Sequence, residues 1–336
     1  MTRYAVPLVL AAAFCGAASA HHSRAIFSDE VVSFQGEVVR FDWSNPHSYI
    51  YVKAQDANGA AVEWEIETQS TPGLVRLGWT QDSLKPGDRV TVRARPHRDA
   101  SLHSAFAQGF IKEDGTVLAS VLSASGAPAS PVSAPRAQNL WGVWRVVSPR
   151  GRGFGKPPDL SLPLTAQGRA AAVRFNDRDD PLIECIPLTA PEGMGGEYLH
   201  ALEQSGTNVL LRDEFWEVVR TVYMDGRAHP PANERFQQGH STGRWEGDAL
   251  VVETTNFTDN VWGVARGIPS GAQKRVVERY RLTDDGATLT IDFTLEDAEY
   301  LTKPIVGSQK WRYVPDLELL PNKCDLEVAH RYLRRN

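Results

Sequence analysis

The sequence predicts an all-β protein built from two barrel domains, with few short helices. Apolar and polar residues alternate in many short runs separated by turn residues, which is the pattern of half-buried strands. Nine tryptophans and only three methionines suit aromatic packing between strands better than a helical bundle. A stretch rich in Pro, Ala and Ser, residues 120–138, has the composition of a linker and divides the chain in two.

The first 20 residues have the features of a secretory signal peptide. Arg3 supplies a positive charge, residues 5–16 are mostly apolar, and Ala18-Ser19-Ala20 is a cleavage site of small residues. A short membrane anchor is the alternative interpretation, but the apolar stretch is shorter than the roughly 20 residues that a span needs. We therefore expect a periplasmic or secreted protein without a membrane span.

Charge and cysteine content narrow the possible partners and bonds. The net charge of −5 disfavours nucleic acid as the main partner, because phosphate binding needs a basic surface. The mature chain keeps only Cys185 and Cys324. In an oxidising compartment such a pair forms a disulfide more often than a metal site. This bond would tie the C-terminal end of the chain back to its middle.

Residues 21–119 are predicted to form the first domain. Thr71 is expected to cap one short helix that has Pro72 at its first position. The strand candidates are VSFQGEVVRFDW, SYIYVKAQD, AVEWEIE, RVTVRARP and SAFAQGFI. The order of three strands, a helix and two strands fits a five-stranded barrel of the OB type.

This first segment also resembles a small exported bacterial domain of unknown function. The motifs that carry the resemblance are His21-His22-Ser23, Trp43-Ser44-Asn45-Pro46-His47, Gly78-Trp79 and Leu84-Lys85-Pro86-Gly87-Asp88. The resemblance covers residues 21–119. It implies an exported protein and a small β domain, and it brings no established activity.

Residues 139–336 are predicted to form the second domain. A short helix is expected after its cap, Thr165. The strand candidates are LWGVWRVV, YLHALEQ, NVLLRDE, WEVVRTVYMD, GRWEG, DALVVETTNF, KRVVERYRLT, TLTIDFTLED and IVGSQKWRYVP. Closing about eight such strands into an antiparallel barrel removes the exposed edges. An open β-sandwich is the alternative.

The start of the second domain, Gly142-Val143-Trp144, resembles the opening of lipocalin-like (calycin) barrels. In those barrels the Trp packs across the closed end and often contacts an Arg from a later strand. The domain also resembles a group of uncharacterised exported bacterial proteins over residues 141–325, which has no assigned reaction. The shared pieces are Asp225-Gly226-Arg227-Ala228-His229-Pro230, Gly239-His240-Ser241, Gly243-Arg244-Trp245-Glu246-Gly247-Asp248, Val277-Glu278-Arg279-Tyr280 and the two cysteines.

Strand alternation selects two charged residues of the second barrel. In the run 216–224, Trp216 and Arg220 fall on one face, which is otherwise apolar. A buried guanidinium needs a partner. We expect either a structural Arg220 that contacts Trp144 or a carboxylate such as Glu253, or an Arg220 that contacts a ligand. Glu253 is also expected to face inward, where burial would raise its pKa and suit it for acid–base catalysis.

Two histidines fall in the loop that follows this run. His229 and His240 are expected at the mouth of the barrel, near Asp225, where neutral imidazoles could transfer protons or bind a metal. A structural role, in which at least one ring satisfies backbone groups of the loop, is the alternative. The predicted ligand-binding residues are Trp216, Arg220, Asp225, His229, His240 and Trp245.

The mature N-terminus is a candidate copper site. Cleavage after Ala20 would free an α-amine on His21, and His22 and His47 offer further imidazoles for a nitrogen-rich plane. In the alternative interpretation these histidines bind nothing. No other cofactor is indicated.

Three functions therefore remain open after the sequence is read. The first is binding of a small-molecule ligand in the second barrel. The second is acid–base catalysis in the same barrel, such as isomerisation, dehydration or hydrolysis, with Glu253 or His240 as the base and Arg220 stabilising negative charge. The third is copper binding at the N-terminus. Protein partners are unknown.

Overall fold

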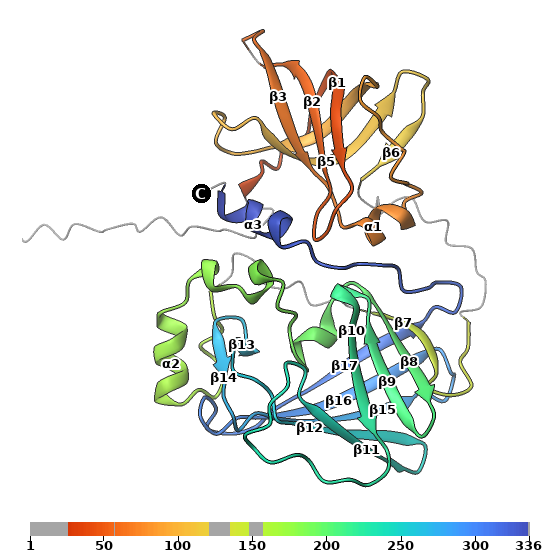
Figure 1. The fold of residues 1–336 in the computed structure, drawn as a ribbon, viewed down its shortest axis with the longest axis vertical. Helices are drawn as coiled ribbons and strands as arrows, with labels where there is room; N and C mark the ends of the chain where they lie inside the picture. Colours follow the sequence, from red (N-terminus) through yellow and green to blue (C-terminus); the bar gives the residue numbers. More distant parts are fainter. Residues whose placement is uncertain (1–25, 57, 121–134, 148–156, 335–336) are drawn as a thin grey trace, which may run out of the picture.

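The computed structural model describes residues 26–56, 58–120, 135–147 and 157–334. It shows two closed β-barrels, one above the other in Figure 1, with the C-terminal segment running between them. The predicted signal peptide and most of the predicted linker lie outside the described residues. Helices are few and short, as predicted.

The first barrel has the strand order of an OB-type fold. Its elements are β1 (Val32–Asp42), β2 (Tyr49–Gln55), β3 (Ala61–Glu67), α1 (Thr71–Arg76), β4 (Arg89–Pro96), β5 (Ser104–Lys112) and β6 (Val117–Ala119). β1 pairs with β2 and β4, and a parallel pairing of β3 with β5 closes the ring, while β6 extends one edge. The core is apolar and includes Val38, Ile50, Ile66, Trp79 and Phe110.

The segment between β1 and β2 fixes the start of helix α1. Asn45 is buried, and its side-chain oxygen accepts hydrogen bonds from the backbone N–H of Thr71 at 2.9 Å and from its hydroxyl at 3.1 Å. The prediction that Thr71 caps the helix was wrong by one position, because Ser70 is the N-cap and makes no side-chain capping bond. Asn45 therefore satisfies an N–H group that a helix start leaves without an intrahelical partner.

The second barrel is a closed ring of nine strands. The strands are β7 (Gly142–Val146), β8 (Leu199–Ser205), β9 (Asn208–Asp213), β10 (Val218–Tyr223), β11 (His240–Glu246), β12 (Ala249–Thr255), β15 (Arg275–Leu282), β16 (Thr288–Glu296) and β17 (Ile305–Tyr313). The ring follows the order of the chain, with β13 and β14 left out between β12 and β15, and the pairing of β17 with β7 closes it. All neighbours pair antiparallel except β10 and β11, which are parallel. Closure excludes the open sandwich.

One end of the second barrel is packed with aromatic side chains. Trp144 is fully buried, donates its indole N–H to the Leu140 carbonyl at 3.1 Å, and contacts Tyr313. Next to it, Trp141 and Trp245 meet edge to face. These rings close this end.

The other end is covered by a segment that we call the cap. It consists of residues 157–196 and the hairpin of β13 (Asn260–Ala265) and β14 (Ile268–Ser270). Residues 157–196 contain α2 (Ala166–Val173), whose N-cap is Thr165 as predicted, and the 3-10 turns η2 (Asp177–Asp179), η3 (Pro181–Glu184) and η4 (Glu192–Gly195). Figure 1 shows α2 beside β13 and β14 at this end of the barrel.

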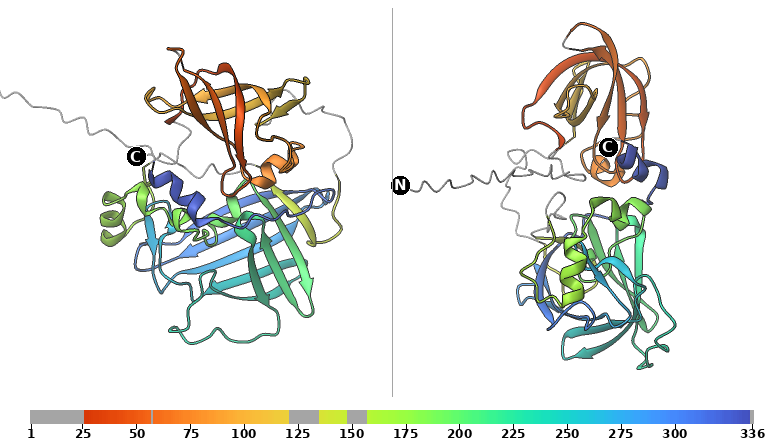
Figure 2. Two further views of the ribbon diagram at one scale, coloured as in Figure 1. Left: turned by 45° about the horizontal axis from the view of Figure 1, so that its top comes forward. Right: turned by 90° about the vertical axis from the view of Figure 1, so that its left-hand side faces the viewer.

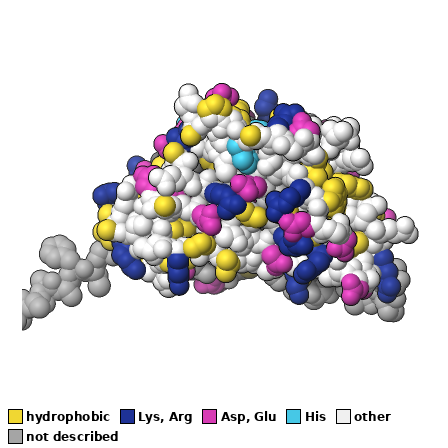
Figure 3. Space-filling model, turned by 90° about the horizontal axis from the view of Figure 1, so that it is seen from below, with side chains coloured by type: hydrophobic (Ala, Val, Ile, Leu, Met, Phe, Trp, Pro, Cys, Tyr) yellow, Lys and Arg dark blue, Asp and Glu magenta, His cyan; other side chains and the backbone are white. Residues whose placement is uncertain are grey.

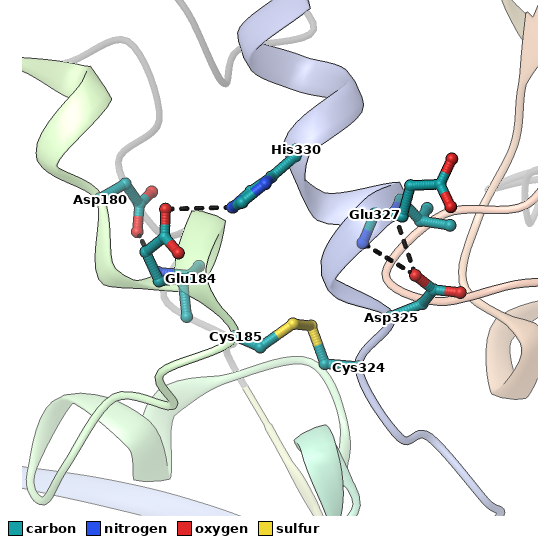
Figure 4. Close-up of a disulfide and its surroundings, with 9 residues drawn as sticks. Asp180, Glu184, Cys185, Cys324, Asp325, Glu327 and His330 are labelled. Atoms are coloured by element: carbon teal, nitrogen blue, oxygen red, sulfur yellow. Dashed lines mark hydrogen bonds and ion pairs between the residues drawn. A yellow bond between two sulfur atoms is a disulfide. The ribbon is translucent and has the colours of Figure 1, made fainter.

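The C-terminal segment, residues 314–334, forms a strap across both barrels (Figure 2). Its helix α3 (Leu326–Arg334) packs Val328 against Tyr49 and Tyr51 of the first barrel. The predicted disulfide between Cys185 and Cys324 is present, with the Cα atoms 5.8 Å apart, and joins the strap to the turn after η3 (Figure 4). Among the described residues, no helix is long and apolar enough to cross a membrane.

Candidate functional site

A cavity of about 340 Å³ lies between the rim of the second barrel and the cap. The barrel contributes Val218 at the start of β10, Phe293 and Leu295 at the end of β16, and Ile305 at the start of β17. The cap contributes Leu162, Leu182, Leu188, Trp262 and Val264 among others. The walls are thus mostly apolar, as is usual for small-molecule sites.

A few charged side chains reach the same cavity. They are Asp159, Glu192, Asp213 and Arg266. Arg266 is held by an ion pair with Asp177, and its guanidinium lies 4.6 Å from the ring centre of Trp262. These groups would orient a ligand, because polar groups placed in an apolar wall select the position of a ligand's own polar atoms.

Below the floor of the cavity lies a buried ion pair. Arg220, the next inward position after Val218 on β10, donates to both carboxylate oxygens of Glu278, at 2.5 and 2.7 Å. Tyr280 donates to Glu278 at 2.8 Å, and Arg220 also donates to the Thr254 hydroxyl at 3.2 Å. Burial opposes the charge on Arg220, but Glu278 and Tyr280 outweigh it and raise the pKa of the guanidinium. Arg220 therefore faces inward, as predicted, and it binds side chains of the barrel itself, which gives it a structural role.

His200 lies at the edge of this buried layer. It stacks on Trp311 with ring centres 4.2 Å apart, and its Nδ1 is 3.8 Å from the carboxylate of Asp213, which lines the cavity. Burial lowers the pKa of His200 to about 3, so the ring is neutral at physiological pH.

Lys274 joins the two parts of the cap. Its fully buried ammonium donates to the Thr189 hydroxyl and to the Gly263 carbonyl, both at 2.6 Å. Thr189 belongs to the 157–196 part and Gly263 to the β13–β14 hairpin. Burial lowers the pKa of Lys274 to about 7.

The prediction that Glu253 faces inward and pairs with Arg220 was wrong. Thr254 points into the barrel, so Glu253 lies on the outer wall, where it forms an ion pair with Arg275 at 3.0 Å. Its predicted raised pKa was also wrong, because the hydrogen bond from Arg275 lowers the pKa of this carboxyl. Leu250, Val251 and Val252 are all buried, so the sequence gives no alternation that assigns the face.

Two tryptophans of the predicted ligand-binding set lie away from Arg220. Trp216 is not in the strand, because it sits in the turn η5 (Phe215–Glu217) with φ of 56° and stacks on Phe215. Trp245 lies at the closed end of the barrel with Trp141, opposite the cavity. Neither lines the cavity.

The two loop histidines lie together on the outer wall. The Nδ1 atoms of His229 and His240 are 3.0 Å apart, and His240 stacks on Tyr223. Burial lowers the pKa of His240, and the nearby His229 and Arg227 lower it further. Asp225 bonds to Arg227, which lowers the pKa of its carboxyl to about 2. The underside of this barrel carries mixed acidic and basic side chains, with histidine at the surface (Figure 3).

Arg220, Glu253 and His240, the three predicted catalytic residues, are therefore not in one site. Arg220 is inside the barrel, and the other two are outside it. Of the predicted copper ligands, His21 and His22 lie outside the described residues, and His47 bonds through Nδ1 to the Thr68 carbonyl at 3.0 Å.

The comparison with known families concerns the first barrel only. Residues 9–106 match DUF6152, a family of unknown function. The match ends within β5 and includes no residue of the second barrel. No curated protein matches the chain. The comparisons thus bring a domain of unknown function, and the cavity has to be interpreted from its own chemistry.

Proposed function

We propose that this chain is an exported protein that binds a small, largely apolar molecule in the second barrel, at its capped end. The cavity between rim and cap is the observation that carries the proposal. Its volume of about 340 Å³ is at the lower end of the range for ligand pockets. The ligand is therefore small, of the size of a single substituted aromatic ring or a short acyl chain.

The location supports the same function. Barrels of about eight strands enclose room for one small ligand at an open end. Here aromatic side chains occupy one end, around the fully buried Trp144, whereas the capped end keeps free volume next to Trp262, Phe293 and Ile305. The buried ion pair below the floor fixes the strands that carry these walls.

The cavity can be tested by filling it. Val218 lines the cavity, and its neighbour Val219 faces outward and is 47% exposed. Val218→Trp should weaken the binding of an uncharged single-ring probe, 4-ethylphenol, measured by calorimetric titration, about tenfold or more, because the indole occupies the free volume. Val219→Trp is the matched control and should bind the probe as the natural protein does. Equal binding by all three proteins would contradict the proposal.

A further inference from the structure

A second site lies on the outer wall of the same barrel, away from the cavity. His229 comes from the long loop between β10 and β11, and His240 is the first residue of β11. Their Nδ1 atoms face each other at 3.0 Å, and the rings are nearly perpendicular, at 79°. Both side chains are partly exposed, so an ion and its water ligands can reach them from solvent.

We propose that His229 and His240 bind one divalent transition-metal ion, copper(II) most tightly. Metal–nitrogen bonds are about 2.0–2.1 Å long, so two nitrogens at right angles on one ion lie about 2.9 Å apart, and two at the tetrahedral angle lie about 3.3 Å apart. The two Nδ1 atoms are now joined by a hydrogen bond of 3.0 Å, and this separation is close to the one that a right-angled pair of ligands needs. Right-angled nitrogen ligands are typical of copper(II) and nickel(II), and copper(II) binds such sites most tightly of the divalent series.

The residues around His229 support the use of its Nδ1 as a ligand. Its other nitrogen, Nε2, lies 3.4 Å from the Thr242 hydroxyl and 3.8 Å from the carboxylate of Glu253. A metal-bound histidine usually donates its second ring N–H to such an oxygen, which fixes the tautomer. With the proton held on Nε2, the Nδ1 of His229 accepts the hydrogen bond from the Nδ1–H of His240. An ion bound between the two rings replaces that hydrogen-bonding proton, and His240 then carries its own proton on Nε2.

The surrounding charges are balanced. Arg227 is paired with Asp225, and Arg275 is paired with Glu253 and with Glu296. These carboxylates offset the repulsion that the guanidinium groups would exert on a dication. Within the described part of the chain, no three or more His, Cys, Asp and Glu side chains lie close enough together to hold a metal ion by themselves. Water therefore completes the coordination, which implies moderate affinity.

The experiment uses the mature protein with His21→Ala and His22→Ala, because those histidines are separate copper candidates. Calorimetric titration with copper(II) should show one ion per chain, and the paramagnetic resonance spectrum should show two imidazole nitrogens. His240→Asn should weaken binding by about tenfold or more, since one of two protein ligands is lost. His330→Asn, which removes a histidine paired with Glu184 instead, is the control and should bind normally.

The metal-free melting temperatures of all variants show whether each one folds. If His240→Asn does not fold, His229→Gln serves the same purpose. Absence of copper binding in the double-alanine protein would overturn the proposal, as would equal binding by the His240→Asn protein.

Discussion

The buried pair of Arg220 and Glu278 should be the most sensitive point of the second barrel. The Glu278 side chain is fully buried, and it accepts two bonds from Arg220 and one from Tyr280. Glu278→Gln removes the charge and leaves the guanidinium buried without a counter-ion. Removing one partner of such a pair costs about 3–5 kcal/mol. We expect a loss of this size in the free energy of unfolding, measured by urea denaturation with tryptophan fluorescence at pH 7.

A double variant separates charge from packing. Arg220→Met with Glu278→Gln has no buried charge left at this point, so it should be more stable than Glu278→Gln alone. Glu203→Gln is the control, because its partner Arg212 is exposed, and surface pairs contribute about 0–1 kcal/mol. If Glu278→Gln costs no more than Glu203→Gln, or if the two substitutions at the pair are additive, the reasoning about the buried pair is refuted.

Three further predictions concern the cap, the strap and an ion pair between the two barrels. Burial lowers the pKa of Lys274 from 10.5 to about 7. Between these two pH values the unfolded chain holds the proton of Lys274 and the folded chain does not. The free energy of unfolding should therefore rise with pH from about 7 to 10, by up to about 1.4 kcal/mol per pH unit. Lys274→Met should remove this rise when the free energy of unfolding is measured by urea denaturation at several pH values. The same pH dependence in the natural protein and the variant would contradict the prediction. Serine at both Cys185 and Cys324, 139 residues apart, should cost about 5 kcal/mol in the chain-entropy model, and a reductant should destabilise the natural protein but not this variant. Arg76 of α1 is paired with Glu214, whose side chain is fully buried. Arg76→Met should therefore lower the free energy of unfolding by about 3 kcal/mol and speed proteolysis between the barrels. Lys85→Met removes an exposed ion pair and should do neither.

Much of the fold follows from local sequence patterns. The alternation of Leu289, Ile291, Phe293 and Leu295 predicts the buried face of β16, and all four are buried. The order of strands and helix predicts the first barrel, whose pairing agrees with it. The direction of β11 was not predicted, because an antiparallel barrel was expected, whereas the loop after β10 returns along the barrel and makes β11 parallel to β10.

The site was predicted less well, for two physical reasons. The alternation of the strand that contains Val276, Glu278 and Tyr280 places these three side chains on the buried face, so the sequence does contain a signal for Glu278 as the partner of Arg220. Glu253 instead lies in a strand whose neighbouring residues are buried on both faces, so alternation does not assign its direction. The cavity depends on the cap, and residues 157–196 contain turns without a hydrophobic period. No local pattern therefore connects Leu188 or Glu192 to the barrel rim.

The identity of what fills the cavity tests the central claim most directly. The protein without residues 1–20, purified without detergent, and its Val218→Trp variant should be compared by native mass spectrometry and by analysis of extracted small molecules. The account predicts one small, largely apolar molecule per chain in the natural protein and its loss in the variant. A natural protein that carries nothing and binds no apolar probe, or a variant that retains the same molecule, would contradict it.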